Sequence, residues 1–79
     1  MPEISALAKR VKAYRESLGK TQFELSGEMG ISIEELSLIE RAEATPRLST
    51  MQKIAAHMGI TVSALLEVEG RKRNVGNRV

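Results

Sequence analysis

TQFELSGEMGISIEELSLIER, residues 21–41, decides the fold of this 79-residue chain. The stretch predicts two short helices, at about 22–29 and 33–41, joined by the turn Gly30-Ile31-Ser32. Apolar residues recur in it at helical spacing, at Leu25, Met29, Ile31, Leu36 and Ile39. Two helices joined this tightly cannot lie side by side, so they cross steeply and present the second one as an outward ridge.

Both helices carry start signals. Thr21 with Glu24, and Ser32 with Glu35, fit the capping box, in which a hydroxyl and a carboxylate satisfy the free amides of a first turn. Gly27 lies inside the first of these helices and costs about 1 kcal/mol relative to alanine, which indicates either a close neighbouring backbone or a locally weak helix. The segment therefore predicts a helix-turn-helix motif.

The flanking sequence predicts three more helices, at about 3–18, 48–58 and 62–67, so that residues 1–67 form one all-α domain of five helices. The apolar stripes behind this prediction are Ile4, Leu7, Val11, Tyr14 and Leu18, then Leu48, Met51, Ile54, Ala55 and Met58, and finally Val62, Leu65 and Leu66. Residues 68–79 have little apolar content and are expected to be a flexible basic tail.

Charge is unevenly distributed along the chain. The net charge is +2, but 4 of the 12 basic residues follow Gly70, whereas all 10 acidic residues precede it. The predicted domain is therefore slightly acidic. Because phosphate contacts supply much of the affinity of a DNA-binding protein, this distribution argues mildly against tight DNA binding by the folded part.

Composition excludes several function classes. There is no cysteine, no aspartate and a single histidine, His57, so no metal site or cofactor is expected, and His57 is interpreted as simply solvated. Catalysis needs paired groups in a cleft, which this inventory does not offer, so the chain is not expected to be an enzyme. No apolar run reaches the roughly 18 residues of a membrane span and no signal peptide is evident, which predicts a cytoplasmic protein.

Over about residues 4–66 the chain resembles the phage repressor and Cro-type helix-turn-helix family of small DNA-binding regulators. The matching residues, with x for any residue, are Gln22-x-x-Leu25-Ser26-x-x-Met29-Gly30-Ile31-Ser32-x-x-x-Leu36-Ser37-x-Ile39-Glu40-Arg41. The resemblance implies a compact five-helix, lambda-repressor-like domain. It also implies a transcriptional regulator that binds double-stranded operator DNA as a homodimer, with the helix at 33–41 in the major groove.

The resemblance assigns roles to individual residues. Arg15 and Glu40 match a pair that forms a structural salt bridge in many members, and Gln22 matches a glutamine that holds a DNA phosphate. We also expect phosphate contacts from Lys9, Arg10, Lys12 and Arg47. The family's base-facing positions correspond to Ile33, Glu34, Glu35 and Leu38.

The base-facing positions depart from the usual chemistry. Base edges are most often read by Arg or Lys on guanine and by Asn or Gln on adenine, and none of these residues is present there. Glutamate can accept from cytosine, and Ile33 or Leu38 can touch a thymine methyl group. Alternatively, Phe23, Ile33 and Leu38 form an exposed apolar patch that binds another protein. A third interpretation is that Ile33 and Leu38 only pack against neighbouring side chains, and Glu34 and Glu35 only favour a helix start.

Two further expectations concern the helix that ends near residue 41 and the assembly. Ala42 replaces the glycine that the family commonly uses after this helix, so the helix either runs on or ends in a strained turn. Val62, Leu66 and Val68 offer a short apolar seam for a homodimer.

Overall fold

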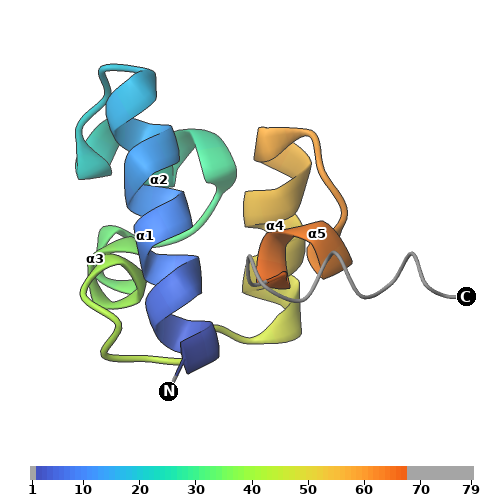
Figure 1. The fold of residues 1–79 in the computed structure, drawn as a ribbon. Coiled ribbons are helices and arrows are strands. Elements are labelled where there is room, and N and C mark those ends of the chain that lie inside the picture. The colour runs from blue at the N-terminus through green and yellow to red at the C-terminus, as the bar shows by residue number, and fades with distance from the viewer. Residues whose placement is uncertain (1, 68–79) are drawn as a thin grey trace, which may run out of the picture.

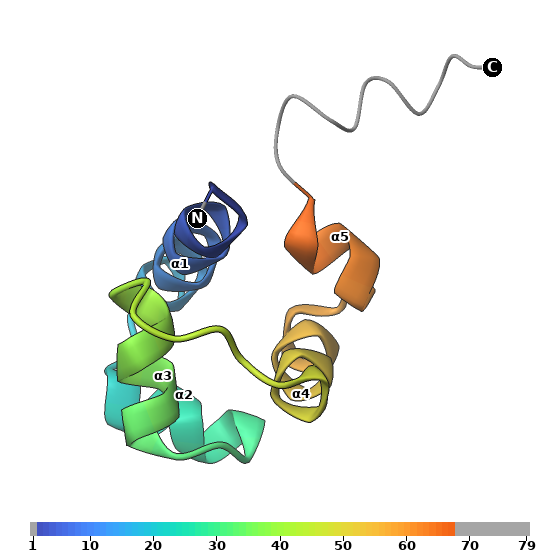
Figure 2. The same ribbon diagram turned by 90° about the horizontal axis from the view of Figure 1, so that it is seen from below.

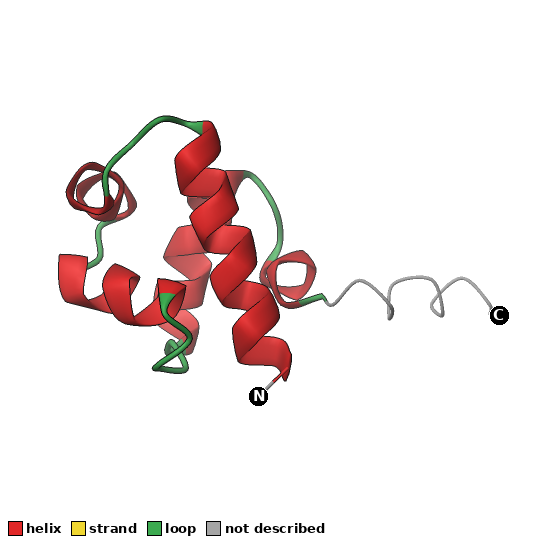
Figure 3. Cartoon of the chain, turned by 60° about the vertical axis from the view of Figure 1, so that its left-hand side comes forward, coloured by secondary structure: helices red, strands yellow, loops and turns green. Residues whose placement is uncertain are grey.

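A computed structural model describes residues 2–67 as five helices joined by short loops (Figure 3). The helices are α1 Pro2–Ser17, α2 Gln22–Met29, α3 Ile33–Glu40, α4 Leu48–Met58 and α5 Val62–Leu66. Each predicted helix agrees with the observed one to within one residue at either end. The expected basic tail, residues 68–79, lies outside the described residues.

The helices form two groups (Figures 1 and 2). Helix α3 packs on both α1 and α2, and α4 packs on α5. Contacts between α1 and α5, and between α2 and α4, join the two groups around one core. The sharp turn between α2 and α3 therefore leaves one side of α3 facing outward, as the sequence predicts.

The core draws side chains from all five helices. Its buried members are Leu7, Val11, Leu25, Met29, Leu36, Ile39, Ile54, Ala55 and Leu65. Two predicted stripe residues, Leu18 and Leu48, are instead exposed. Leu18 lies just beyond the end of α1 and Leu48 is the first residue of α4, so both lie at helix termini.

Both predicted capping boxes are formed. In α2 the Thr21 hydroxyl accepts from the amide of Glu24, whose carboxylate accepts from the amide of Thr21; Ser32 and Glu35 repeat the arrangement at α3. A carbon atom added at Gly27 would meet nothing within 4 Å, so no neighbouring backbone requires this glycine. This excludes a close neighbouring backbone as the reason for Gly27, and a locally weak α2 remains the prediction.

Helix α3 ends in the strained turn that was one of the two expected outcomes. The amide of Ala42 donates to the carbonyl of Ile39 at 3.0 Å, and the amide of Glu43 donates to that of Leu38 at 2.9 Å. This is the Schellman pattern, which requires a left-handed residue, and Ala42 adopts φ 59°. The equivalent residue after α2 is Gly30, with φ 78°, where no Cβ opposes the conformation.

Replacing Ala42 with glycine should relieve this strain. We expect Ala42→Gly to raise the free energy of unfolding by about 0.5 to 1 kcal/mol, because the left-handed penalty of alanine exceeds the extra chain entropy that glycine loses. Thermal unfolding followed by circular dichroism measures the change. Ala13→Gly, on the exposed face of α1, is the matched control and should lower stability by about 1 kcal/mol. A change of the same sign in both variants would contradict the assignment of strain to Ala42.

Candidate nucleic-acid interface

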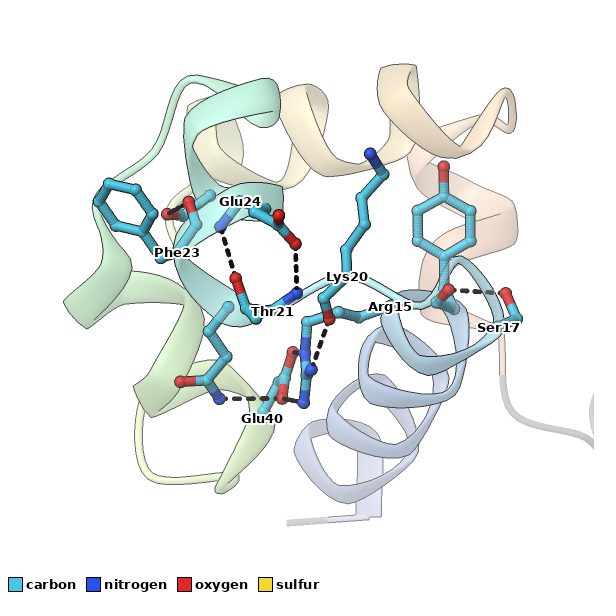
Figure 4. Close-up of polar contacts among 10 residues, drawn as sticks. Arg15, Ser17, Lys20, Thr21, Phe23, Glu24 and Glu40 are labelled. Atoms are coloured by element: carbon cyan, nitrogen blue, oxygen red, sulfur yellow. Dashed lines mark hydrogen bonds and ion pairs between the residues drawn. The ribbon is translucent and has the colours of Figure 1, made fainter.

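The interface is built on an ion pair between Arg15 of α1 and Glu40 at the end of α3 (Figure 4). Arg15 Nε lies 2.8 Å from Glu40 Oε2 and Arg15 Nη2 lies 2.9 Å from Oε1, so the contact is bidentate. The exposed fractions of the two side chains are 15% and 3%. Arg15 also donates from Nη1 to the carbonyl of Lys20, at 2.9 Å, which fixes the entrance to α2.

Gln22 adds α2 to this network. Its Nε2 donates to Glu40 Oε1 at 3.0 Å, so three helices meet at one carboxylate. Gln22 is the first residue of α2, where backbone amides have no partner within the helix. The side chain expected to hold a phosphate is thus oriented by Glu40 and keeps one amide hydrogen free of that bond.

The network sets the ionisation of Glu40. Burial, the largest influence, raises the pKa of this carboxyl group, but hydrogen bonds from Arg15 and Gln22 lower it, and the resulting pKa lies below the ordinary value. The carboxylate is therefore charged at neutral pH and holds both donors.

The outward side of α3 is defined by helical spacing. Leu36 and Ile39 are buried in the core and Glu40 turns toward Arg15, so the residues at offsets of three and four on the opposite side face outward. We call these residues the outer face of α3: Ile33, Glu34, Ser37, Leu38 and Arg41. Ser37 and Arg41 were missed in the sequence, although their spacing from Glu34 and Leu38 indicated them.

Glu35 does not belong to this outer face, which corrects its expected base-facing position. One carboxylate oxygen accepts from the amide of Ser32 at 3.1 Å and the other from the hydroxyl of buried Thr50 at 2.9 Å. The Ser32 amide, followed by the Thr50 hydroxyl, lowers the pKa of Glu35. Glu35 therefore fastens the start of α3 to α4.

The expected phosphate-binding cations divide into two sets. Arg47, which precedes α4, is 79% exposed and only loosely paired with Glu35 at 3.5 Å, and Lys9 and Lys12 are exposed on α1. Arg10 differs, because its Nη1 donates to the carbonyl of Ala64 at 3.0 Å and also to that of Leu65. Arg10 thus ties α1 to α5, away from α3.

The apolar residues considered for a protein contact differ in exposure. Phe23 is 73% exposed and projects from the first turn of α2, away from the ion pair (Figure 4). Ile33 is 42% exposed and Leu38 is half-buried. A shallow hollow adjoins Leu38 and is lined by Ile39, Ala44, Thr45, Pro46 and other neighbours.

His57 is not simply solvated, and that prediction is wrong. Its Nδ1 lies 2.7 Å from the hydroxyl of Tyr14 and its Nε2 lies 3.0 Å from Glu28. Glu28 also accepts from Lys20 at 2.6 Å. Hydrogen bonds from Lys20 and then His57 lower the pKa of Glu28. This cluster joins the ends of α1, α2 and α4.

The described residues, 2–67, contain neither a metal-binding group nor a membrane-spanning helix. Within residues 2–67 no three His, Cys, Asp or Glu side chains are grouped closely enough to hold a metal ion. No helix in the same range is long and apolar enough to span a membrane.

Comparison with known proteins identifies the family. A family model described as helix-turn-helix matches residues 11–65. The chain belongs to this helix-turn-helix family. The match begins within α1 and ends within α5, so it includes the turn at Gly30 and all the residues of the outer face.

Individual relatives of this helix-turn-helix chain include a transcriptional regulator and a repressor. It is 38% identical over 61 residues to the HTH-type transcriptional regulator DdrOP3 of Deinococcus deserti, covering 77% of this chain and 47% of that protein. It is 36% identical over 63 residues to the immunity repressor protein of Bacillus phage phi105, covering 80% and 44%. The chain thus spans about half the length of these curated relatives.

A solved structure has the same helix-turn-helix fold. The crystal structure of a hypothetical transcription factor, NHTF, from Neisseria superposes with a TM-score of 0.75 at 26% identity. The likeness covers 91% of this chain and 83% of that one.

The Glu40 network predicts a specific dependence of stability on pH. Because the pKa of Glu40 lies below the ordinary value of a glutamate, about 4.3, the stabilisation is complete above that ordinary value and is lost as pH falls through the lower folded-state pKa. We expect Glu40→Gln to lower the free energy of unfolding by about 1.5 to 3 kcal/mol near pH 7. The difference from the parent should shrink at lower pH. Urea titrations across the pH range measure it.

Glu16→Gln is the control for this experiment, since Glu16 is an exposed carboxylate on the same helix as Arg15. This variant should stay within about 0.5 kcal/mol of the parent at every pH. A Glu40→Gln deficit that is the same at neutral and acid pH would show that the carboxylate charge does not stabilise the fold.

Proposed function

We propose that this chain binds double-stranded DNA as a transcriptional regulator, with α3 in the major groove. The observation that carries the proposal is the Arg15, Gln22 and Glu40 network, which fixes α2 against α3 and leaves the outer face of α3 free. Membership of the helix-turn-helix family supports it, as do the names of the two curated relatives and of the Neisseria protein. A helix presented in this way has the dimensions to enter the major groove.

Phosphate contacts in this proposal come from the rim of the interface. Gln22 offers its second amide hydrogen and the free amides at the start of α2, and Arg47 offers an exposed guanidinium at the start of α4. Lys9 and Lys12 add charge from α1. Arg10 and Glu35 take structural roles, because both are already hydrogen-bonded to other helices.

We propose that the chain binds DNA without catalysing a reaction. Because duplex DNA is the proposed partner, we also propose a cytoplasmic location. The two curated relatives are named as a transcriptional regulator and a repressor. No comparison supports the alternative in which Phe23, Ile33 and Leu38 bind a protein, and that contact remains a prediction.

Binding to a random duplex pool tests this function. We expect selection to enrich one sequence motif, and the binding constant for that motif to fall steeply with salt as counterions are released from the phosphates. Arg47→Ala should weaken binding to all sequences about equally and reduce the salt slope by about one. Fluorescence anisotropy over a salt series measures both effects.

Lys53→Ala provides the matched loss of one positive charge. Lys53 lies on α4 but points to the carbonyl of Gly30, at 3.2 Å, rather than to the outer face of α3. The salt dependence of DNA binding by Lys53→Ala should therefore have the same slope as that of the parent. Failure to retain any duplex below about 100 mM salt, in a chain that remains helical, would refute the proposed function.

We also propose that the chain acts as a homodimer, because one helix-turn-helix unit covers only half of a two-fold operator. The apolar surface expected for the dimer seam is smaller than the sequence suggests, because Val62 and Leu66 already pack partly on the core of their own chain. The third residue of the expected seam, Val68, lies outside the described residues. Hydroxyl-radical footprinting should give two protected patches about 10 base pairs apart on one side of the duplex. A single patch with one chain bound per duplex would contradict the dimer.

A further inference from the structure

The outer face of α3 lacks the chemistry that usually reads purines. In the major groove guanine presents two acceptors, and adenine presents an acceptor beside an amino donor. These patterns are normally matched by Arg or Lys and by Asn or Gln. On the outer face, the first two turns of α3 carry exposed Ile33 and Glu34 and half-buried Ser37 and Leu38, whose side chains offer no N–H donor.

Arg41 is the one cation on the outer face of α3, and its contacts hold it away from the position where it could bind a purine. Its Nη1 donates to the hydroxyl oxygen of Ser37 at 2.9 Å, and its Nη2 lies 3.2 Å from a carboxylate oxygen of Glu43. Both contacts hold the guanidinium at the end of α3. Base edges are contacted chiefly by the first residues of a recognition helix, which are Ile33 and Glu34 here.

The remaining side chains on the outer face of α3 match the chemical groups that pyrimidines present in the major groove. Ile33 keeps 42% of its surface exposed at the start of α3, and Leu38 borders the shallow hollow one turn later. Branched aliphatic groups of this kind can cover the 5-methyl group of thymine, the one apolar group in the major groove. Glu34 is exposed and has no hydrogen bond or ion pair within residues 2–67, in contrast to Glu35. Its carboxylate can accept from the N4 amino group of cytosine.

We propose that α3 reads pyrimidines: Ile33 and Leu38 contact thymine methyl groups, and Glu34 accepts a hydrogen bond from a cytosine amino group. The inference rests on the proposed function and specifies the base chemistry recognised at that interface. Half-sites should carry thymine and cytosine on the strand that faces the start of α3.

Replacing thymine by deoxyuridine removes only the methyl group and therefore tests the contact directly. In the selected operator, we expect one or two such replacements to weaken binding about fourfold each, the value of one buried carbon group. Ile33→Ala should bind thymine and deoxyuridine equally at one of these positions, and Leu38→Ala at another. Circular dichroism checks that both variants remain helical.

The role of the Glu34 carboxylate is tested by replacing it with an amide, which can donate a hydrogen bond as well as accept one. Glu34→Gln should shift the preferred base at one position from cytosine to adenine, because an amide can both donate to N7 and accept from N6 of adenine. An unchanged preference in this variant would overturn the role of Glu34.

Two controls separate the proposed readout from general effects. Phe23→Ala, a larger apolar loss on α2, should leave the thymine preference intact. Replacing purines by their 7-deaza forms beneath the start of α3 removes the N7 acceptor and should not weaken binding. Loss of affinity with 7-deaza purines, or equal affinity for thymine and deoxyuridine throughout the site, would overturn the inference.

Failure of the inference is distinguishable from failure of the proposed function. Tight, salt-sensitive binding to a selected motif that ignores the methyl groups leaves the DNA-binding function standing and rejects pyrimidine readout. The absence of any enriched motif rejects both.

Discussion

One buried carboxylate holds the interface together. Glu40 receives Arg15 from α1 and Gln22 from α2, so the orientations of three helices are set at a single point. Removing Arg15 would leave the buried carboxylate of Glu40 without its ion-pair partner, which costs more than the net gain of forming the contact. The same contact turns Glu40 inward and thereby determines which residues of α3 face outward.

The interface combines this common scaffold with an uncommon surface. Glu34 and the exposed side chain of Ile33 stand where nitrogen donors are usual, while Arg47 and the lysines of α1 supply positive charge around the rim. In the proposed function, the affinity for DNA and the preference for particular bases thus come from different residues. In the proposed complex, contacts at the rim neutralise phosphates, and the outer face of α3 distinguishes bases.

Local signals in the sequence predicted the fold, whereas the long-range contacts within the site could not be predicted from the sequence. Capping boxes and turn residues act within four positions of the chain, so the helix bounds could be predicted to within one residue. Glu35 instead bonds Thr50, 15 residues away, and His57 contacts Tyr14 across 43 residues. Arg10 meets α5 across 54 residues. Helical periodicity cannot show which of two nearby partners a polar side chain selects.

The central claim is that the surface around the outer face of α3 is where DNA binds. The most direct measurement is a titration of the isotopically labelled chain with duplex DNA, followed by the backbone amide resonances. The account predicts shifts concentrated in α3, at the start of α2 and at Arg47. Shifts confined to α5 and the side of α1 that carries Arg10, with α3 unaffected, would contradict it.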